Sequence, residues 1–213
     1  MQSNLSDVER RVQRYWYTDG IGELIGGGMF ILLGIYFAAQ TYFGENSAVS
    51  AWLQGGLILF LLGGMAIGRW LIKALKSRLT YPRTGYVEYR AYDENRNKRR
   101  ILIALVAGFV AAFSIIFANR TVSFLNMTVA LTGLLVGAIL TFLQGRRSGL
   151  ERFYLLGGIS VVLGIALSLS SLPDGYALGL FYSLMGVAFA ISGGIVLRRY
   201  LRENPFPPED RHE

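Results

Sequence analysis

The chain has no cysteine, and its single histidine is His212. Without cysteine there is no disulfide scaffold and no Cys-ligated zinc or iron–sulfur site. Without a histidine in any apolar stretch, bis-histidine haem and a Ser/His/Asp triad are excluded as well. The sequence also contains no Gly-rich phosphate-binding loop with its lysine. We therefore expect no cofactor, no metal site and no catalytic residue, and hence no enzyme.

Charge is also scarce: 16% of the residues are charged and 53% are hydrophobic, whereas soluble domains carry about 25% charged residues. A helix that crosses a hydrocarbon core about 30 Å thick needs roughly 20 apolar residues. Six stretches meet this requirement, at about 21–43, 51–73, 101–119, 122–144, 152–171 and 176–198. The sequence predicts an all-α, six-span transmembrane bundle over 21–198, with a leader at 1–20 and a cytoplasmic tail at 199–213.

The positive charge is distributed unevenly along the chain. Of the 21 Lys and Arg residues, twenty lie in the leader, in the segment 69–100, after the fourth span and at the C-terminal end. All of these segments fall on one side of a six-span bundle, and cytoplasmic loops are enriched in Lys and Arg. We therefore expect both termini in the cytoplasm, an anionic inner leaflet as the partner of the basic residues, and no nucleic acid.

Two cytoplasmic segments have patterns of their own. In the leader, Ser6 and Glu9 fit a capping box, and apolar residues follow one side, which predicts a short amphipathic helix on the membrane surface. The long loop 77–100 contains β-prone residues at 86–91, which predict a short hairpin. The charges of this loop suit either a solvated loop or the recruitment of a cytoplasmic partner.

Small residues recur at four-residue spacing within the spans. Such ridges allow helix backbones to approach closely, and packing drives helix association in lipid. We expect these ridges to pack the six helices against one another; the alternative is a site for a partner helix. The positions are Gly64, Gly68, Gly108, Gly133, Gly137, Gly164, Gly186, Ala190 and Gly194.

One spacing recurs between odd-numbered spans. In the first span, Gly27-Gly28 is followed after five residues by Gly34-Ile35. The fifth span has the same pattern, with Gly157-Gly158 followed after five residues by Gly164-Ile165. The third span has a looser copy that begins at Ala107-Gly108. The pattern predicts three helical hairpins that all enter from the cytoplasm, and thus parallel repeats.

Two opposite charges lie inside the boundaries of neighbouring spans. Glu23 is about one turn inside the first span, and Arg69 is about one turn inside the second. Antiparallel helices place both at similar depth, where an unpaired charge is costly. We expect Glu23 and Arg69 to pair, or to share a polar partner such as Tyr81 or Tyr86.

The runs RYWYTDGIGEL at 14–24 and LTYPRTGYVEYR at 79–90 resemble an uncharacterised group of bacterial multi-span membrane proteins. This resemblance implies the bacterial cytoplasmic (inner) membrane and no known activity.

Ion pumps and proton-coupled carriers usually have acidic or basic residues at mid-depth in their spans. No predicted span of this chain has such a residue. The leading hypothesis is a non-enzymatic partner, accessory subunit or regulator. The alternative is a channel or carrier for a small neutral or weakly polar solute.

Overall fold

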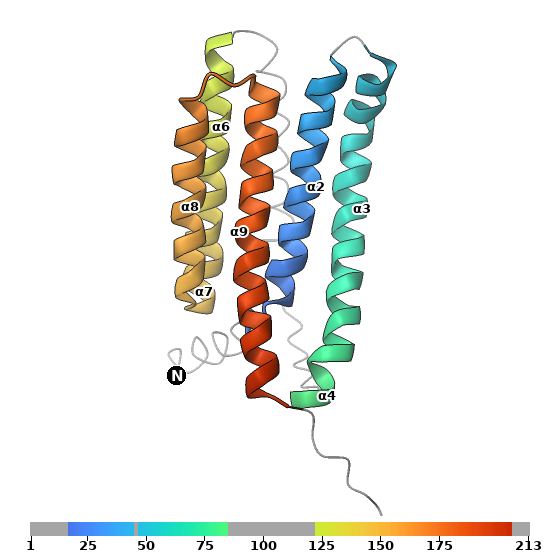
Figure 1. Cartoon of the computed structure of the whole chain (residues 1–213), viewed down its shortest axis with the longest axis vertical. Coiled ribbons are helices and arrows are strands. Elements are labelled where there is room, and N and C mark those ends of the chain that lie inside the picture. The colour runs from blue at the N-terminus through green and yellow to red at the C-terminus, as the bar shows by residue number, and fades with distance from the viewer. Residues whose placement is uncertain (1–16, 45–46, 85–121, 206–213) are drawn as a thin grey trace, which may run out of the picture.

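The computed structural model describes residues 17–44, 47–84 and 122–205 (Figure 1). All regular secondary structure in these ranges is helical. The elements are α2 (Ile21–Phe43), α3 (Ala48–Leu79), α4 (Tyr81–Thr84), α6 (Val122–Ala138), the π-helix η1 (Ile139–Gly145), α7 (Arg146–Ser148), α8 (Glu151–Ser168) and α9 (Asp174–Glu203).

Five of the described helices are long and apolar enough to cross a membrane. They lie where the sequence predicts the first, second, fourth, fifth and sixth spans. The predicted third span at 101–119 lies outside the described residues, as do leader residues 1–16 and the β-prone segment 86–91. The all-α class is thus confirmed for the described part of the chain, together with five apolar helices of membrane-spanning length.

Two helix ends differ from the prediction. Helix α3 continues to Leu79 and is followed by the helical turn α4, so the loop predicted to begin at residue 77 begins later. Helix α9 continues to Glu203, five residues into the predicted tail. Hydropathy predicts only where an apolar stretch ends, whereas polar contacts hold the ends of these two helices. Arg83 of α4 donates to the carbonyl oxygens of Leu201 at 3.1 Å and Asn204 at 2.8 Å, at the end of α9.

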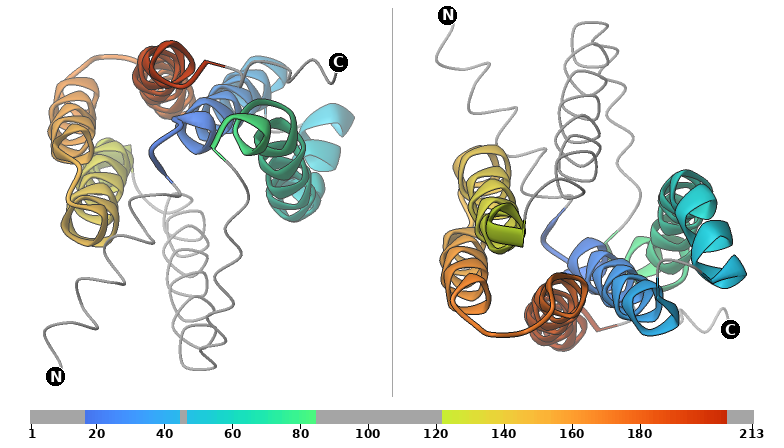
Figure 2. Two further views of the ribbon diagram at one scale, coloured as in Figure 1. Left: turned by 90° about the horizontal axis from the view of Figure 1, so that it is seen from below. Right: turned by 90° about the horizontal axis from the view of Figure 1, so that it is seen from above.

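The helices are arranged as two close pairs and one outer helix. Helices α2 and α9 lie side by side and antiparallel, and so do α6 and α8 (Figures 1 and 2). Helix α3 lies against the opposite side of α2 from α9. Where the two pairs meet, α9 contributes the fully buried Phe181 and Met185, and α8 contributes Phe153 and Leu156.

The interface between α2 and α9 is built on glycine at seven-residue intervals. A Cβ atom added at Gly27 would lie 2.6 Å from the carbonyl oxygen of Gly186, and one added at Gly186 would lie 2.6 Å from that of Gly27. The backbones therefore touch, so a larger residue at either position requires the helices to separate. The three facing pairs are Gly20 with Gly193, Gly27 with Gly186, and Gly34 with Gly179.

The α6–α8 pair uses the same principle. A Cβ added at Gly133 would lie 2.7 Å from the Cα of Gly164, and one added at Gly137 would lie 2.9 Å from the carbonyl oxygen of Gly157. This approach lets the Ser160 hydroxyl donate to the carbonyl oxygen of Gly133 at 2.9 Å across the interface. In each close pair, backbone contact at glycine therefore brings the two helices together.

Candidate functional site

A buried polar cluster occupies the lower end of the bundle in Figure 1, where α2 and α8 begin and where α3 and α9 approach their ends. Its members come from four segments that are distant in the sequence: the start of α2, the end of α3, the start of α8 and the second half of α9. We define the polar cluster as Asp19, Glu23, Lys76, Thr80, Arg152 and Ser192.

Asp19 joins the start of α2 to the end of α3. Its side chain is fully buried, and its Oδ1 accepts a hydrogen bond from the Ile21 backbone N–H at 3.2 Å. Its Oδ2 accepts a hydrogen bond from the Thr80 hydroxyl at 3.2 Å and pairs with the Lys76 ammonium at 3.0 Å. One carboxylate therefore accepts a hydrogen bond from the first backbone N–H of α2 and forms an ion pair with a buried lysine at the end of α3.

The residue that follows Asp19 must be glycine for two reasons. Gly20 has φ +70°, the left-handed region that side chains disfavour. A Cβ there would also lie 3.0 Å from the Cβ of Val196 and closer still to the carbonyl oxygen of Gly193. The same backbone turn that directs Asp19 toward α3 thus lets α2 begin in contact with α9.

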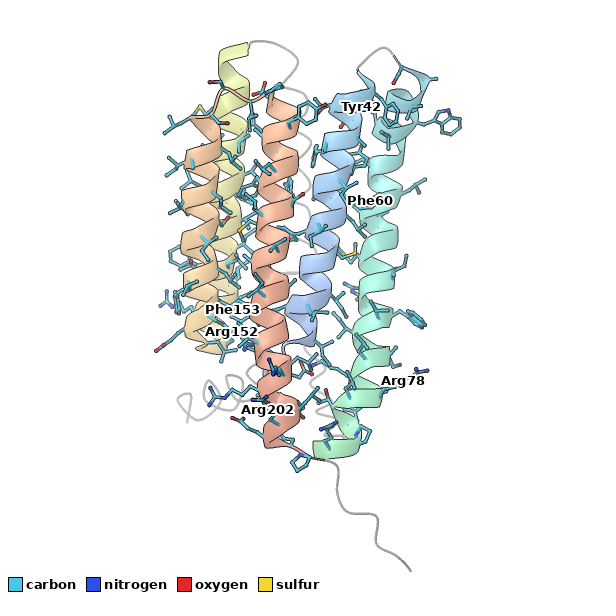
Figure 3. All side chains as sticks on the ribbon, viewed as in Figure 1. Tyr42, Phe60, Arg78, Arg152, Phe153 and Arg202 are labelled. Atoms are coloured by element: carbon cyan, nitrogen blue, oxygen red, sulfur yellow. The ribbon has the colours of Figure 1, made fainter. Side chains whose placement is uncertain are left out.

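Glu23 joins α2 to α8 and α9. Its Oε1 lies 2.7 Å from Nη2 of Arg152, and its Oε2 accepts a hydrogen bond from the Ser192 hydroxyl at 2.7 Å. The Arg152 guanidinium also donates to the carbonyl oxygen of Tyr17 and lies 5.5 Å from the ring centroid of Phe153 (Figure 3). Arg152 is therefore the polar link between the two close helix pairs.

The charges of the polar cluster balance one another. Each carboxylate faces one cation, so Asp19 with Lys76 and Glu23 with Arg152 form two neutral pairs in a largely dry region. Removing one member of such a pair leaves an uncompensated charge, which costs about 3–5 kcal/mol. Within the described ranges, no group of three or more His, Asp or Glu side chains could hold a metal ion. This arrangement is suited to fixing helix ends in place.

The expected pair between Glu23 and Arg69 is corrected by this geometry. Glu23 pairs with Arg152 from α8, whereas the Arg69 side chain is exposed on α3. Both predicted residues do lie near the same end of the bundle. Depth in the membrane follows from sequence position, but the direction in which each side chain points depends on which helices are neighbours.

The predicted small residues divide by their surroundings. Gly133, Gly137, Gly164 and Gly186 lie at the close interfaces, and the backbone nitrogen of Ala190 lies beside Gly27. Gly64 and Gly68 face Met29 and Ile25 of α2. A Cβ added at Gly194 would meet no described heavy atom within 4 Å, and Gly108 lies outside the described residues.

The sequence analysis used the spacing of Gly27 and Gly34 only as evidence of a repeat, and it missed their contact with α9 and the role of Arg152. The signal for the α2–α9 interface was present in the sequence, because Gly20, Gly27 and Gly34 mirror Gly179, Gly186 and Gly193. No comparable pattern singles out Arg152, which is one of several basic residues near the ends of the spans.

An open groove runs between α2 and α3 on the side lined by Gly22, Gly26, Gly64 and Gly68. Its volume is about 320 Å³, and its surface is almost entirely apolar. Arg69 lies toward the end of the groove that is nearer the polar cluster.

No protein-family model, curated protein or solved structure matches this chain.

Proposed function

We propose that the chain is a non-enzymatic, multi-pass protein of the bacterial inner membrane that acts by binding another membrane protein, as a partner, accessory subunit or regulator. The observation that carries this proposal is the exposure of α3. Only 6% of the residues in its most apolar stretch are buried by the described part of the chain, against 22–33% in the other four spanning helices.

The side of α3 that faces away from the groove has the form of a helix-docking surface. Gly56, Leu59, Gly63 and Trp70 recur there at helical spacing, and we call these four residues the outer face of α3. Neither glycine has a described heavy atom within 4 Å of an added Cβ, while Leu59 is 73% and Trp70 is 67% exposed. Glycines flanked by large apolar side chains allow another helix to pack closely in lipid.

The alternative, a channel or carrier for a small polar solute, has less support. Such a path needs polar groups that line a cavity, whereas several of the described hydroxyls within the spans bond to helix backbone. Thr132 donates to the carbonyl oxygen of Thr128 at 2.8 Å, and Ser160 donates to that of Gly133 at 2.9 Å. The groove between α2 and α3 offers almost no polar surface to a solute.

A six-span topology with both termini in the cytoplasm is part of the proposal. The described chain stops at Thr84, at the lower end of the bundle in Figure 1, and resumes at Val122, at the upper end. The apolar stretch 101–119 is long enough to cross a membrane, and we propose that it provides the sixth span between these two ends. The concentration of basic residues at the lower end supports a cytoplasmic location for that end, because cytoplasmic loops are enriched in Lys and Arg.

The repeat of helical hairpins is also proposed, and the glycines of α2 and α8 support it. Gly27 and Gly34 contact α9, and the matching Gly157 and Gly164 contact η1 and α6. Gly28 and its match Gly158 both have open space around them. Equivalent positions thus have equivalent surroundings in two helices; the third copy, at residues 107–115, lies outside the described ranges.

Photocrosslinking in native membranes tests the proposed function. A photoreactive amino acid is placed at Gly63 on the outer face of α3 and, as a matched control, at Gly158 on α8, because both sites have room for a side chain. We expect Gly63 to give an adduct of defined additional mass and Gly158 to give none. Equal adduct yields at the two sites, or no adduct at Gly63, would contradict a partner on this face.

A further inference from the structure

The groove between α2 and α3 runs from the membrane surface toward the middle of the bilayer. Exposed tryptophans occur at both ends of the apolar part of α3, Trp52 at 82% and Trp70 at 67% exposure. Eighteen residues separate them, which is about 27 Å of helix and close to the hydrocarbon thickness of about 30 Å. Tryptophan prefers the membrane–water boundary, so Trp70 and its neighbour Arg69 lie at headgroup level.

The groove therefore has the dimensions of one leaflet. On α3 its lining extends from Ile72 to Leu61. The part from Arg69, at headgroup level, to Leu61 covers eight residues, or about 12 Å of the hydrocarbon region. Its walls are apolar, with Gly22, Gly26 and Met29 on the α2 side. An added Cβ at Gly22 or Gly26 would meet no described heavy atom within 4 Å, so this surface is open to an apolar chain.

Positive charge lies at the mouth of the groove. Arg69 lines the groove, and Lys73 lies one helical turn further along the same side of α3. Both side chains are exposed. Among the described residues, no ion pair involves Arg69 or Lys73. Lys76, one turn beyond Lys73 on α3, differs because it pairs with Asp19. Two exposed cations at headgroup depth, neither paired with an acidic side chain of the described residues, complement a phosphate group.

We propose that this groove is a binding site for an anionic phospholipid of the inner leaflet. One acyl chain lies between Gly22 and Gly26 of α2 and Gly64 and Gly68 of α3, and the lipid phosphate is held by Arg69 and Lys73. The site is distinct from the outer face of α3, which lies on the opposite side of that helix. It requires that the bundle spans the membrane, but it does not require a protein partner.

Native mass spectrometry of the full chain in detergent tests the headgroup contact. Phosphatidylglycerol and phosphatidylcholine with identical acyl chains are added at equal concentration. We expect one retained phosphatidylglycerol per chain and a preference over phosphatidylcholine of about tenfold or more, since each basic residue near the surface contributes to binding an anionic lipid. The double variant Arg69→Gln/Lys73→Gln should lose the preference. The matched control Arg78→Gln/Arg198→Gln removes two exposed basic residues outside the groove and should keep it.

Narrowing the groove tests the acyl-chain contact. Gly26→Leu should lower the retention of both lipids, whereas Gly28→Leu, at an open position of α2 outside the groove, should not. Equal retention of the two lipids by the unchanged chain would overturn the proposal, as would normal retention by Gly26→Leu. A much larger loss of thermal stability in Gly26→Leu than in Gly28→Leu would also overturn it, because a protein segment would then fill the groove. Photocrosslinking from Gly63 is unaffected by any of these results, so this proposal and the proposed function can fail separately.

Discussion

Gly27 of α2 and Gly186 of α9 each face the carbonyl oxygen of the other, with 2.6 Å between that oxygen and the position of an added Cβ in both directions. The contact is reciprocal because the two helices are antiparallel and both repeat glycine every seven residues. Gly20 and Gly34 on α2 extend it toward the two ends of the interface. The backbone contact between the first and last spanning helices thus runs along most of α2.

Gly27→Ala should destabilise the protein, because one added methyl group must separate two backbones that touch. Overpacking of this kind costs about 1–3 kcal/mol. The neighbouring Gly28→Ala adds the same group to open space and should be neutral or slightly stabilising, since alanine favours the helix by up to about 1 kcal/mol. Thermal unfolding in detergent measures both variants, and equal melting temperatures would contradict the close α2–α9 contact.

The α6–α8 pair predicts a second contrast. A Cβ at Gly137 would lie 2.7 Å from Cγ2 of Val161, so Gly137→Leu should separate α6 from α8 and lower the melting temperature by several degrees. Gly158→Leu, on the open side of α8, serves as the control and should leave the melting temperature near that of the unchanged protein. If Gly158→Leu is the more destabilising variant, the assigned faces of α8 are reversed.

Glu23 and Arg152 should be energetically coupled. Glu23→Gln or Arg152→Gln alone leaves a buried charge without its partner, at a cost of about 3–5 kcal/mol, whereas the double variant removes both charges. In a double-mutant cycle on the free energy of unfolding, we expect a coupling of at least about 1 kcal/mol. Glu23→Gln combined with Arg69→Gln should be additive, because Arg69 is exposed and Glu23 faces Arg152. Coupling to Arg69 in place of Arg152 would restore the pair expected from the sequence.

Asp19 should show two separable contributions. Asp19→Asn keeps an oxygen that can accept from the Ile21 N–H but no longer neutralises Lys76. Asp19→Ala also loses the hydrogen bond from the Ile21 N–H, which is worth about 1 kcal/mol. We therefore expect Asp19→Ala to be less stable than Asp19→Asn, and Asp19→Asn to be less stable than the unchanged protein, by denaturant titration in detergent micelles. An Asp19→Asn variant of unchanged stability would mean that the pair with Lys76 contributes nothing.

The five long apolar helices were predictable because a membrane span requires about 20 apolar residues, which a sequence displays directly. For α2 the predicted and observed ends coincide at Ile21 and Phe43. The end of α3 was not predictable in this way, because its last turns lie beyond the hydrophobic stretch. They are fixed by contacts such as Lys76 with Asp19, which join residues 57 positions apart.

The polar cluster was predictable only in part. The sequence showed that Glu23 needs a partner, since a carboxylate inside a span is costly when unpaired. It did not show which cation pairs with Glu23, because Arg69 and Arg152 both lie near the same end of the predicted bundle as Glu23. The choice follows from the α2–α9 and α6–α8 interfaces, which bring the start of α8 beside the start of α2. The glycines at seven-residue spacing held part of that information.

The central claim is that the bundle spans the membrane with the polar cluster at its cytoplasmic end. Because the chain has no cysteine, single-cysteine variants can be labelled with a membrane-impermeant thiol reagent in intact cells. Ser77 and Gly149 lie at the polar-cluster end of the bundle, and Ser47 and Ser171 lie at the opposite end. We expect labelling of Ser47→Cys and Ser171→Cys in intact cells, and of Ser77→Cys and Gly149→Cys only after permeabilisation. Labelling of Ser77→Cys in intact cells with protection of Ser171→Cys would contradict the orientation, and labelling of all four would contradict a membrane-spanning bundle.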